Sequence, residues 1–222
     1  MSMSNKLLKI EDLELSFKMY EGISTVLKKI NLELSKGEKV ALVGESGSGK
    51  SVTTKLILGL LNQKNVSKKG KILFNDRNIL NLPQNEYKKI RGNNIAIIFQ
   101  DPIAALNPVF KIKDQFYEVN SINNNISKKD SFIKTCKALE KVSITDPERI
   151  LESYPFQLSG GLAQRVVITM AMINKPELLL ADEPSTALDV TIQNQALDLM
   201  DDLTKETNTA VLLITHNMGV VR

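Results

Sequence analysis

The feature that most limits the possible folds of this chain is a glycine-rich segment at residues 44–51. An apolar run at residues 39–43 precedes it and predicts a buried strand, and residues 52–61 predict a helix. The segment matches the pattern G-x-x-x-x-G-K-[S/T] at every fixed position, as Gly44-Glu45-Ser46-Gly47-Ser48-Gly49-Lys50-Ser51. A strand, this loop and a helix in register indicate an α/β fold with a phosphate-binding loop. A Gly/Ser-rich turn without a ligand is the alternative, and the Lys-Ser pair disfavours it.

Each residue type in this loop suits a polyphosphate. Glycines let the backbone N–H groups turn inward, where they join the free N–H groups at the helix start, Val52 included. Lys50 supplies a positive charge for the β- and γ-phosphates during binding and reaction, and the Ser51 hydroxyl can ligate Mg²⁺. We therefore expect all of residues 44–52 to contact a nucleoside triphosphate.

A second apolar run, residues 177–181, ends in two carboxylates, Asp182 and Glu183. If both runs are strands of one parallel sheet, these carboxylates lie at the same edge as the phosphate loop. Asp182 then suits a Mg²⁺-water contact, and Glu183 suits the deprotonation of an attacking water. A solvated acidic turn is the alternative, which the phosphate loop makes less favourable.

Residues 158–165 read Leu-Ser-Gly-Gly-Leu-Ala-Gln-Arg and lead into a predicted helix over residues 162–174. The hydroxyl of Ser159 and the unpaired N–H groups of Gly160 and Gly161 would lie at the positive end of this helix. Such an end can bind an anion, so the sequence predicts a second anion site. A helix cap without a ligand is the alternative.

This octapeptide resembles the signature motif of ATP-binding cassette (ABC) ATPases, and other motifs of that family follow in order over nearly the whole chain. Three phrases resemble a narrower subgroup, the ATPases of oligopeptide, dipeptide and nickel importers. They are QDPIAALNP at 100–108, YPFQ at 154–157 and ALDVTIQ at 187–193. The resemblance implies a P-loop NTPase core of mostly parallel sheet, an N-terminal antiparallel β subdomain and an inserted helical subdomain.

The resemblance also implies roles for single residues. His216, the one histidine of the chain, follows a predicted strand at 211–215 and would contact the γ-phosphate and steady the attacking water. Gln100 follows a predicted strand at 95–99 and would approach Mg²⁺ and that water, although it could also be a polar strand end. Asn217 stands where the family very often has Asp, so one negative charge beside His216 is missing.

In the resembled family, two subunits form a head-to-tail dimer in which the signature of one covers the ATP on the phosphate loop of the other. The signature residues expected to bind that ATP are Ser159, Gly160, Gly161 and Gln164. An aromatic side chain from an N-terminal loop would stack on adenine. Tyr20 fits that loop, Phe17 is the other candidate, and an aromatic of the core or turn is the alternative reading.

The resemblance implies an ATPase that uses ATP and Mg²⁺ to power the uptake of peptides or nickel. Its partners would be transmembrane permease subunits, a second ABC ATPase subunit forming a heterodimer, and indirectly an extracytoplasmic substrate-binding protein. It would lie peripherally on the cytoplasmic face of the membrane. The alternative is a soluble ABC ATPase acting on DNA or ribosomes, which would require long coiled-coil insertions or a second cassette. A non-hydrolysing scaffold is disfavoured by the intact catalytic residues.

Composition narrows these options. The net charge is only +4, from 29 basic and 25 acidic residues, and the lysine pairs are scattered. This pattern disfavours a nucleic-acid partner. Cys136 is the single cysteine, so no disulfide framework or Cys/His metal site is expected. No apolar run reaches the roughly 20 residues of a membrane span, and the polar start does not predict a signal peptide.

The chain is expected to form a single nucleotide-binding domain over residues 1–222, with residues 101–157 as its helical subdomain. Breaks in that segment are predicted near 107–108, 121–127 and 146–147. Strand-like alternation within residues 7–34 and 70–74 predicts an antiparallel sheet that covers the nucleotide. Because the resembled family continues past the histidine, we expect residues 1–222 to be a C-terminally truncated form.

Overall fold

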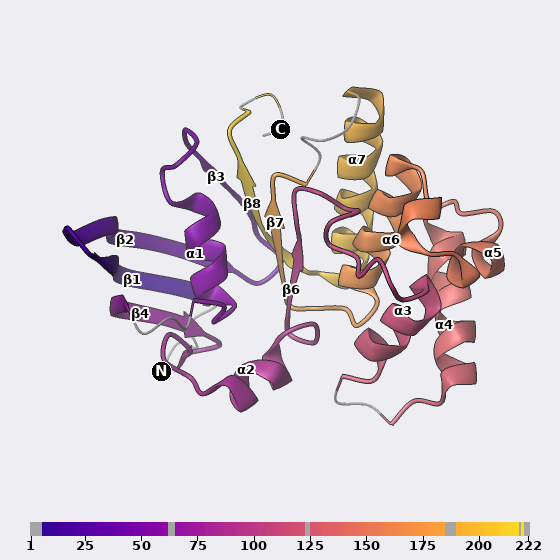
Figure 1. Cartoon of the computed structure of the whole chain (residues 1–222), viewed down its shortest axis with the longest axis horizontal. Helices are drawn as coiled ribbons and strands as arrows, with labels where there is room; N and C mark the ends of the chain where they lie inside the picture. The colour runs from indigo at the N-terminus through magenta and orange to yellow at the C-terminus, as the bar shows by residue number, and fades with distance from the viewer. Residues whose placement is uncertain (1–5, 62–64, 123–124, 185–189, 218, 220–222) are drawn as a thin grey trace.

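The computed structural model describes residues 6–61, 65–122, 125–184, 190–217 and 219, with the backbone alone for residues 190 and 191. Figure 1 shows an antiparallel sheet at one side, a parallel sheet in the middle and most of the helices at the other side. The parallel sheet therefore has a different layer on each face. None of the described helices combines the length and the apolar composition needed to cross a membrane.

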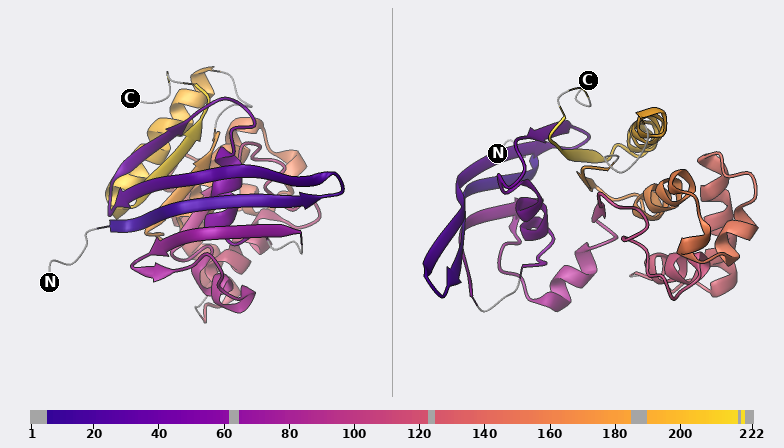
Figure 2. Two further views of the ribbon diagram at one scale, coloured as in Figure 1. Left: turned by 90° about the vertical axis from the view of Figure 1, so that its left-hand side faces the viewer. Right: turned by 45° about the horizontal axis from the view of Figure 1, so that its top comes forward.

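The antiparallel sheet is built around a long hairpin. Its strands run in the order β2-β1-β4-β5 and span β1 Lys6–Met19, β2 Gly22–Ser35, β4 Val66–Phe74 and β5 Arg77–Asn78. The predicted antiparallel sheet is confirmed, but the first two strands are 14 residues each rather than several short ones. The pairing shifts between Ile10 and Leu13, where Asp12 has a φ of 45°, so β1 bends there without ending. The bend lets the hairpin curve over the core (Figure 2).

The central sheet is parallel throughout. Its strands run in the order β3-β8-β7-β6 and span β3 Lys39–Val43, β6 Ile95–Ile98, β7 Leu178–Asp182 and β8 Ala210–Thr215. All four were predicted within one residue at each end, because parallel strands covered on both faces are nearly continuous apolar runs. Their carboxyl ends share one edge, so the loops that follow them lie together.

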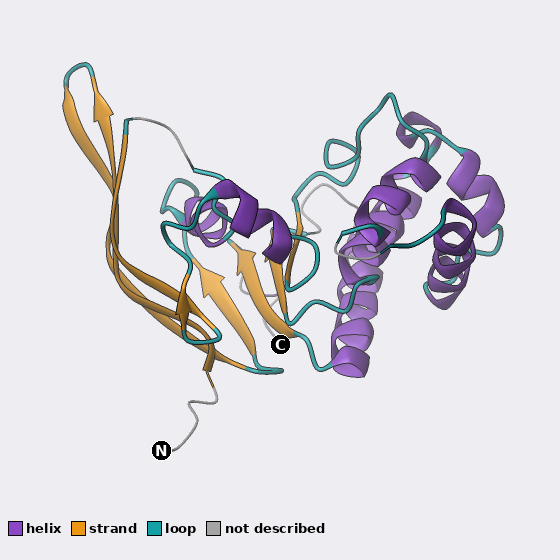
Figure 3. Cartoon of the chain, turned by 90° about the horizontal axis from the view of Figure 1, so that it is seen from below, coloured by secondary structure: helices purple, strands orange, loops and turns teal. Residues whose placement is uncertain are grey.

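Side chains of β7 show how the two faces of this sheet are covered. Leu178 and Leu180 belong to an apolar cluster that includes the antiparallel sheet and α1 (Lys50–Ile57). Leu179 and Ala181 point into the other cluster, formed with α6 (Gly160–Met172) and α7 (Val190–Thr207). This alternation follows the two-residue period of a strand. It places α1 and α6 on opposite faces of the sheet (Figure 3).

Three helices differ from the sequence prediction, and one of them, α6, lies two residues earlier than the expected 162–174. The helix expected over residues 52–61 begins at Lys50 and ends at Ile57. It ends early because Gly59 turns left-handed, with a φ of +62°, and a Cβ there would lie 2.3 Å from the Tyr87 ring. That ring belongs to α2 (Gln84–Ile90), a short helix that the sequence analysis did not predict.

The segment between β6 and α6 is helical, as predicted. It contains α3 Ile112–Asn120, α4 Lys128–Lys141, α5 Pro147–Glu152 and a 3₁₀ turn, η1 Pro155–Gln157. The predicted breaks coincide with the loop before α3, the connection between α3 and α4, and the start of α5. Asp146 caps α5 by accepting a hydrogen bond from the N–H of Arg149 over 3.2 Å, with Pro147 at the first helical position.

Candidate functional site

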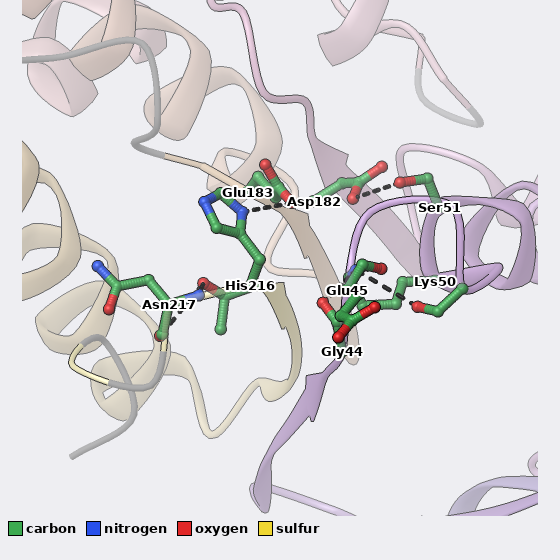
Figure 4. Close-up of polar contacts among 10 residues, drawn as sticks. Gly44, Glu45, Lys50, Ser51, Asp182, Glu183, His216 and Asn217 are labelled. Carbon is green, nitrogen blue, oxygen red and sulfur yellow. Dashed lines mark hydrogen bonds and ion pairs between the residues drawn. The ribbon is translucent and has the colours of Figure 1, made fainter.

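The phosphate loop connects β3 to α1, and Lys50 is the first residue of that helix. The side chain of Lys50 is 8% exposed, while residues 45–48 of the loop are exposed. Its Nζ donates hydrogen bonds to the carbonyl oxygens of Gly44 over 2.7 Å and Glu45 over 2.8 Å (Figure 4). The loop therefore curves around an ammonium group, which is a suitable place for a polyphosphate.

Two glycines give the loop its shape. Gly49 has a φ of +94°, and a Cβ at this position would lie 2.6 Å from Cδ2 of Leu27 in β2. Gly47 has a φ of +81°, yet a Cβ there would meet no atom within 4 Å. The loop thus packs against the antiparallel sheet at Gly49 and opens to solvent at Gly47. This open cradle, with the free N–H groups at the start of α1, fits a phosphate chain.

Two side chains with oxygen atoms that could bind a metal ion lie beside the phosphate loop. Ser51 Oγ donates a hydrogen bond to Asp182 Oδ1 over 2.9 Å, which joins the start of α1 to the end of β7 (Figure 4). Burial raises the pKa of the Asp182 carboxyl, and the neighbouring Glu183 also raises it, whereas the bond from Ser51 lowers it. A hydroxyl and a carboxylate side by side are hard oxygen donors, the kind that Mg²⁺ prefers.

The second carboxylate turns toward the histidine. Glu183 Oε1 lies 2.9 Å from Nδ1 of His216. Glu183 has a φ of +48°, unusual for a residue with a side chain, and its N–H donates to the Ile214 carbonyl over 2.9 Å. This backbone turn sends two consecutive carboxylates to different partners, Asp182 to Ser51 and Glu183 to His216 (Figure 4). Strain of this kind is typical of functional sites.

The residue after the histidine closes a turn. Asn217 donates its N–H to Oγ1 of Thr215 over 3.0 Å and accepts a bond from the N–H of Gly219 over 2.9 Å. An aspartate would accept that second bond equally well, so the turn behind His216 does not require the missing charge. Gln100 is exposed two residues beyond β6, which pairs with β7, and so follows the sheet at the same edge as Asp182.

The signature segment caps α6. Ser159 is the N-cap, and its Oγ accepts a weak hydrogen bond of 3.4 Å from the N–H of Leu162. Ser159 is exposed and Gly160 and Gly161 are partly exposed, which keeps this helix start accessible to an anion. Because α1 and α6 cover opposite faces of the sheet, the chain does not bring this end and its own phosphate loop into one pocket.

Gln164 does not fit the nucleotide contact that the sequence analysis gave it. Its side chain is 1% exposed, and Nε2 donates a hydrogen bond to the backbone carbonyl of Pro184 over 2.6 Å. Helical periodicity accounts for this, because Gln164 lies on the face of α6 that packs on the sheet. We therefore leave it out of the proposed nucleotide contacts.

The two candidate aromatic residues lie in different surroundings. Tyr20 is in the turn between β1 and β2 and is fully exposed. Phe17 is partly buried against the core and lies on the same side of β1 as Leu15. Leu15 pairs with Leu27 of β2, and Leu27 is the residue that packs against the phosphate loop at Gly49. The geometry favours Phe17 over Tyr20 as the adenine contact. Residues 185–189, which include part of the phrase at 187–193, lie outside the described residues.

A parallel sheet with a phosphate loop at its carboxyl edge, flanked by an acidic strand end, defines the class of P-loop nucleoside-triphosphate-binding proteins. Within this class, a family model described as "ABC transporter" matches residues 27–186. The chain belongs to the ABC transporter family.

Relatives and solved structures agree with this assignment. The chain is 46% identical to the oligopeptide transport ATP-binding protein OppD of Bacillus subtilis (strain 168), over 97% of this chain and 61% of that protein. It is 44% identical to the dipeptide transport ATP-binding protein DppD of Lactococcus lactis subsp. cremoris (strain MG1363), over 97% of this chain and 62% of that one. The chain thus spans less than two thirds of the length of these relatives.

The fold is similar to that of the ABC transporter cassette MJ0796 in its dimeric structure, with a TM-score of 0.82 and 29% identity over 97% of this chain and 90% of that one. It is also similar to the dimeric post-hydrolysis state of the same cassette bound to ADP and Pi, with a TM-score of 0.81 and 29% identity. That alignment covers 96% of this chain and 89% of the other.

Proposed function

We propose that this chain is the ATP-binding and ATP-hydrolysing subunit of an ABC importer of peptides. The observation that carries the proposal is the Glu183–His216 pair, which lies at the same sheet edge as the phosphate loop. A carboxylate held by an imidazole beside a phosphate site is suited to general-base activation of water. The Ser51–Asp182 pair adds oxygen ligands for a metal ion at the same edge of the sheet.

In this mechanism each residue has a separate task. Lys50 and the N–H groups of residues 44–52 bind the phosphates of ATP. Mg²⁺, when bound by Ser51, Asp182 and Gln100, supplies charge neutralisation on the phosphate oxygens. Glu183 accepts a proton from the attacking water. His216 holds that carboxylate through Nδ1, which leaves Nε2 as the ring nitrogen that can face the γ-phosphate.

The second half of each site comes from another subunit. Since the phosphate loop and the helix start at Ser159 lie on opposite faces of one sheet, a nucleotide can touch both only if a second chain supplies one of them. We propose a head-to-tail dimer with a second ABC ATPase, in which Ser159, Gly160 and Gly161 cover the partner's nucleotide. Phe17 would stack on the adenine of the chain's own ATP.

An exposed apolar surface supports a membrane-protein partner. The loop after Gln100 exposes Val109 at 73% and Phe110 at 52%, and Phe156 is 71% exposed nearby. The N–H of Ile112 donates to the carbonyl of Ser153 over 3.0 Å, which holds the two segments together. Exposed aromatic side chains on a connected surface are typical of protein interfaces. We propose that transmembrane permease subunits dock here, at the cytoplasmic face of the membrane.

The names of the relatives, oligopeptide and dipeptide transport ATP-binding proteins, favour peptides over nickel as the transported substrate. They do not favour the soluble DNA- or ribosome-directed alternative. An extracytoplasmic binding protein would select the peptide and act on this chain only indirectly. Proteoliposomes that contain the complete transporter can distinguish the two substrates. The measurement compares their uptake of a labelled dipeptide with their uptake of ⁶³Ni²⁺.

Glu183→Gln tests the chemistry. The amide keeps an oxygen near His216 but cannot take a proton, so steady-state ATP turnover should fall about 10²- to 10⁴-fold while ATP affinity stays nearly unchanged. In that background, Mg-ATP should drive sedimentation of this chain with its partner ATPase as a dimer. Adding Ser159→Arg should block the dimer and leave monomer binding intact. Unchanged turnover, or a dimer that persists with Arg, would contradict the proposal.

A further inference from the structure

A groove outside the nucleotide site lies near the C-terminal ends of α4, α6 and α7. These helices belong to the apolar cluster on the face of the parallel sheet that is opposite to α1 (Figure 1). The groove has a volume of about 250 Å³. Its apolar wall is formed by Ala138, Val142, Met172, Ile173 and Leu203. We call it the lysine groove, because its other lining residues include Lys134, Lys137, Lys141 and Lys175.

The charges around the lysine groove are unbalanced. Among the described residues, Glu206 is the one carboxylate that lines it, and Lys141 Nζ lies 2.8 Å from its Oε1. This ion pair bridges α4 and α7 at one end of the groove. In the part of the chain that the structure describes, the other three lysines have no ion-pair partner. The groove therefore presents uncompensated positive charge beside apolar surface.

Lys134 is the cation best placed to bind an anion in this groove. It is partly buried, and the one hydrogen bond of its Nζ to a described residue goes to Oδ1 of Asn174 over 3.2 Å. Asn174 is itself held, because its Nδ2 donates to the carbonyls of Gly92 and Val119. An ammonium has three donors, so N–H groups remain for a ligand. Burial lowers the pKa of Lys134 and the nearby Lys175 lowers it further, and a bound anion would oppose both effects.

Helix ends account for only some of these lysines. Lys141 is the last residue of α4 and Lys175 follows α6, so both offset the negative end of a helix dipole. Lys134 lies seven residues before the end of α4, about 10 Å away, where the dipole no longer acts. Lys137 follows it on the same helix face, and like charges at this spacing destabilise a helix. Neither lysine is thus explained by the stability of α4.

We propose that the lysine groove binds a free medium-chain fatty acid. The carboxylate lies between Lys134 and Lys175, and the alkyl chain lies along Ala138 and Leu203. Inorganic phosphate would leave the apolar wall uncovered, and a free peptide would bring an ammonium group that the lysines repel. A cavity of about 150 Å³ holds the six carbons of benzene, so about 250 Å³ holds roughly ten carbons. Decanoate is therefore the probe of suitable size.

The length of the ligand chain and its charge give separate readouts. Calorimetric titration of the full-length chain with hexanoate, octanoate and decanoate should show a dissociation constant that falls about fourfold per added methylene. Dodecanoate should gain less per carbon, because its last carbons extend beyond the groove. Decan-1-ol has the same chain as decanoate without the charge, so it should bind about 10- to 100-fold more weakly.

Lys134→Met removes the charge and keeps an apolar side chain. It should weaken decanoate binding by the same 10- to 100-fold or so and leave decan-1-ol binding unchanged. The matched control is Lys129→Met, because Lys129 is exposed on the same helix and does not line the groove. This control should keep the wild-type affinity for decanoate. If Lys134→Met does not fold, Lys175→Met gives the same test at an exposed position.

Ala138→Trp tests the position of the alkyl chain. The indole fills the groove, so binding of both decanoate and decan-1-ol should be lost. ATP affinity should stay at the wild-type value in every variant, which verifies that each is folded and that the lysine groove is separate from the nucleotide site.

Three results would overturn the fatty-acid site. They are equal affinities for decanoate and decan-1-ol, an affinity that does not depend on chain length, and equal losses in Lys134→Met and Lys129→Met. Tighter binding of an acetylated amphipathic peptide of Glu and Leu than of decanoate, lost in Lys134→Met, would also overturn the proposal, because it would assign the groove to a protein partner.

Discussion

Replacing Gly49 by alanine should destabilise the protein through two separate effects. A φ of +94° is costly for a residue with a Cβ, by roughly 1–2 kcal/mol. The new Cβ would also lie 2.6 Å from Cδ2 of Leu27, a side chain that is 2% exposed and enclosed by the core. Overpacking at such a site costs about 1–3 kcal/mol. We therefore expect Gly49→Ala to lower the free energy of unfolding by about 2–5 kcal/mol.

Gly47 provides a matched control within the same loop. Its φ is +81°, but a Cβ there would meet no atom within 4 Å. Gly47→Ala should therefore cost only the backbone term, about 1–2 kcal/mol. In a Leu27→Ala background the contact is absent, so the cost of Gly49→Ala should fall to the same range. The non-additivity of the double mutant then measures the packing term.

The assay is urea unfolding of the nucleotide-free protein, monitored by circular dichroism, for the three single variants and the double mutant. ATP affinity, measured in parallel, should fall for Gly49→Ala because the loop must leave β2 to relieve the contact. Equal unfolding free energies for Gly47→Ala and Gly49→Ala would refute the reasoning. So would a Gly49→Ala cost that Leu27→Ala does not reduce.

Lys50→Ala should weaken ATP binding as well as turnover, because it removes a contact to the phosphates that is present before reaction. His216→Ala should mainly reduce turnover. Steady-state kinetics and equilibrium binding measure both effects, and a His216→Ala variant that lost affinity but kept its rate would contradict the assignment. Phe17→Ala should weaken binding of a fluorescent ATP analogue by about 1–3 kcal/mol and Tyr20→Ala should not, and the reverse order would restore Tyr20 as the stacking residue. Burial raises the pKa of Asp182, so its charged form destabilises the nucleotide-free fold at neutral pH. Asp182→Asn should consequently raise the melting temperature at pH 7. The difference should shrink as the pH falls below 3.8, the ordinary pKa of the carboxyl, and a pH-independent difference would count against this cause.

Most of the central sheet follows from local sequence patterns. Strands buried on both faces are continuous apolar runs, so β3, β6, β7 and β8 could be located closely from the order of residues alone. The helix after the phosphate loop was less well predicted. Its end at Ile57 follows from Gly59, whose left-handed backbone lets the N–H groups of Gly59 and Leu60 close the last turn on the carbonyls of Leu56 and Lys55. A glycine stop signal of this kind is local, but the period of the apolar residues does not contain it.

The position of the carboxylates was also predictable, since parallel strands place their carboxyl ends at one edge. The different hydrogen-bonding partners of the two carboxylates could not be predicted from the sequence. Asp182 meets Ser51 and Glu183 meets His216 because the backbone of Glu183 turns left-handed, a conformation that strand β8 imposes through a hydrogen bond. The roles given to these residues and to the signature remain predictions that the experiments above can test.

Gln164 shows most clearly how local pattern and tertiary packing differ in what they specify. The residue order establishes that a glutamine follows a helix cap in an ABC signature, and that its amide can donate and accept hydrogen bonds. The packing of α6 on the core then directs this amide to Pro184 instead of a nucleotide. Residue types and their spacing specify strands, caps and loop chemistry, whereas the partner of a buried polar group depends on which distant backbone is packed against it.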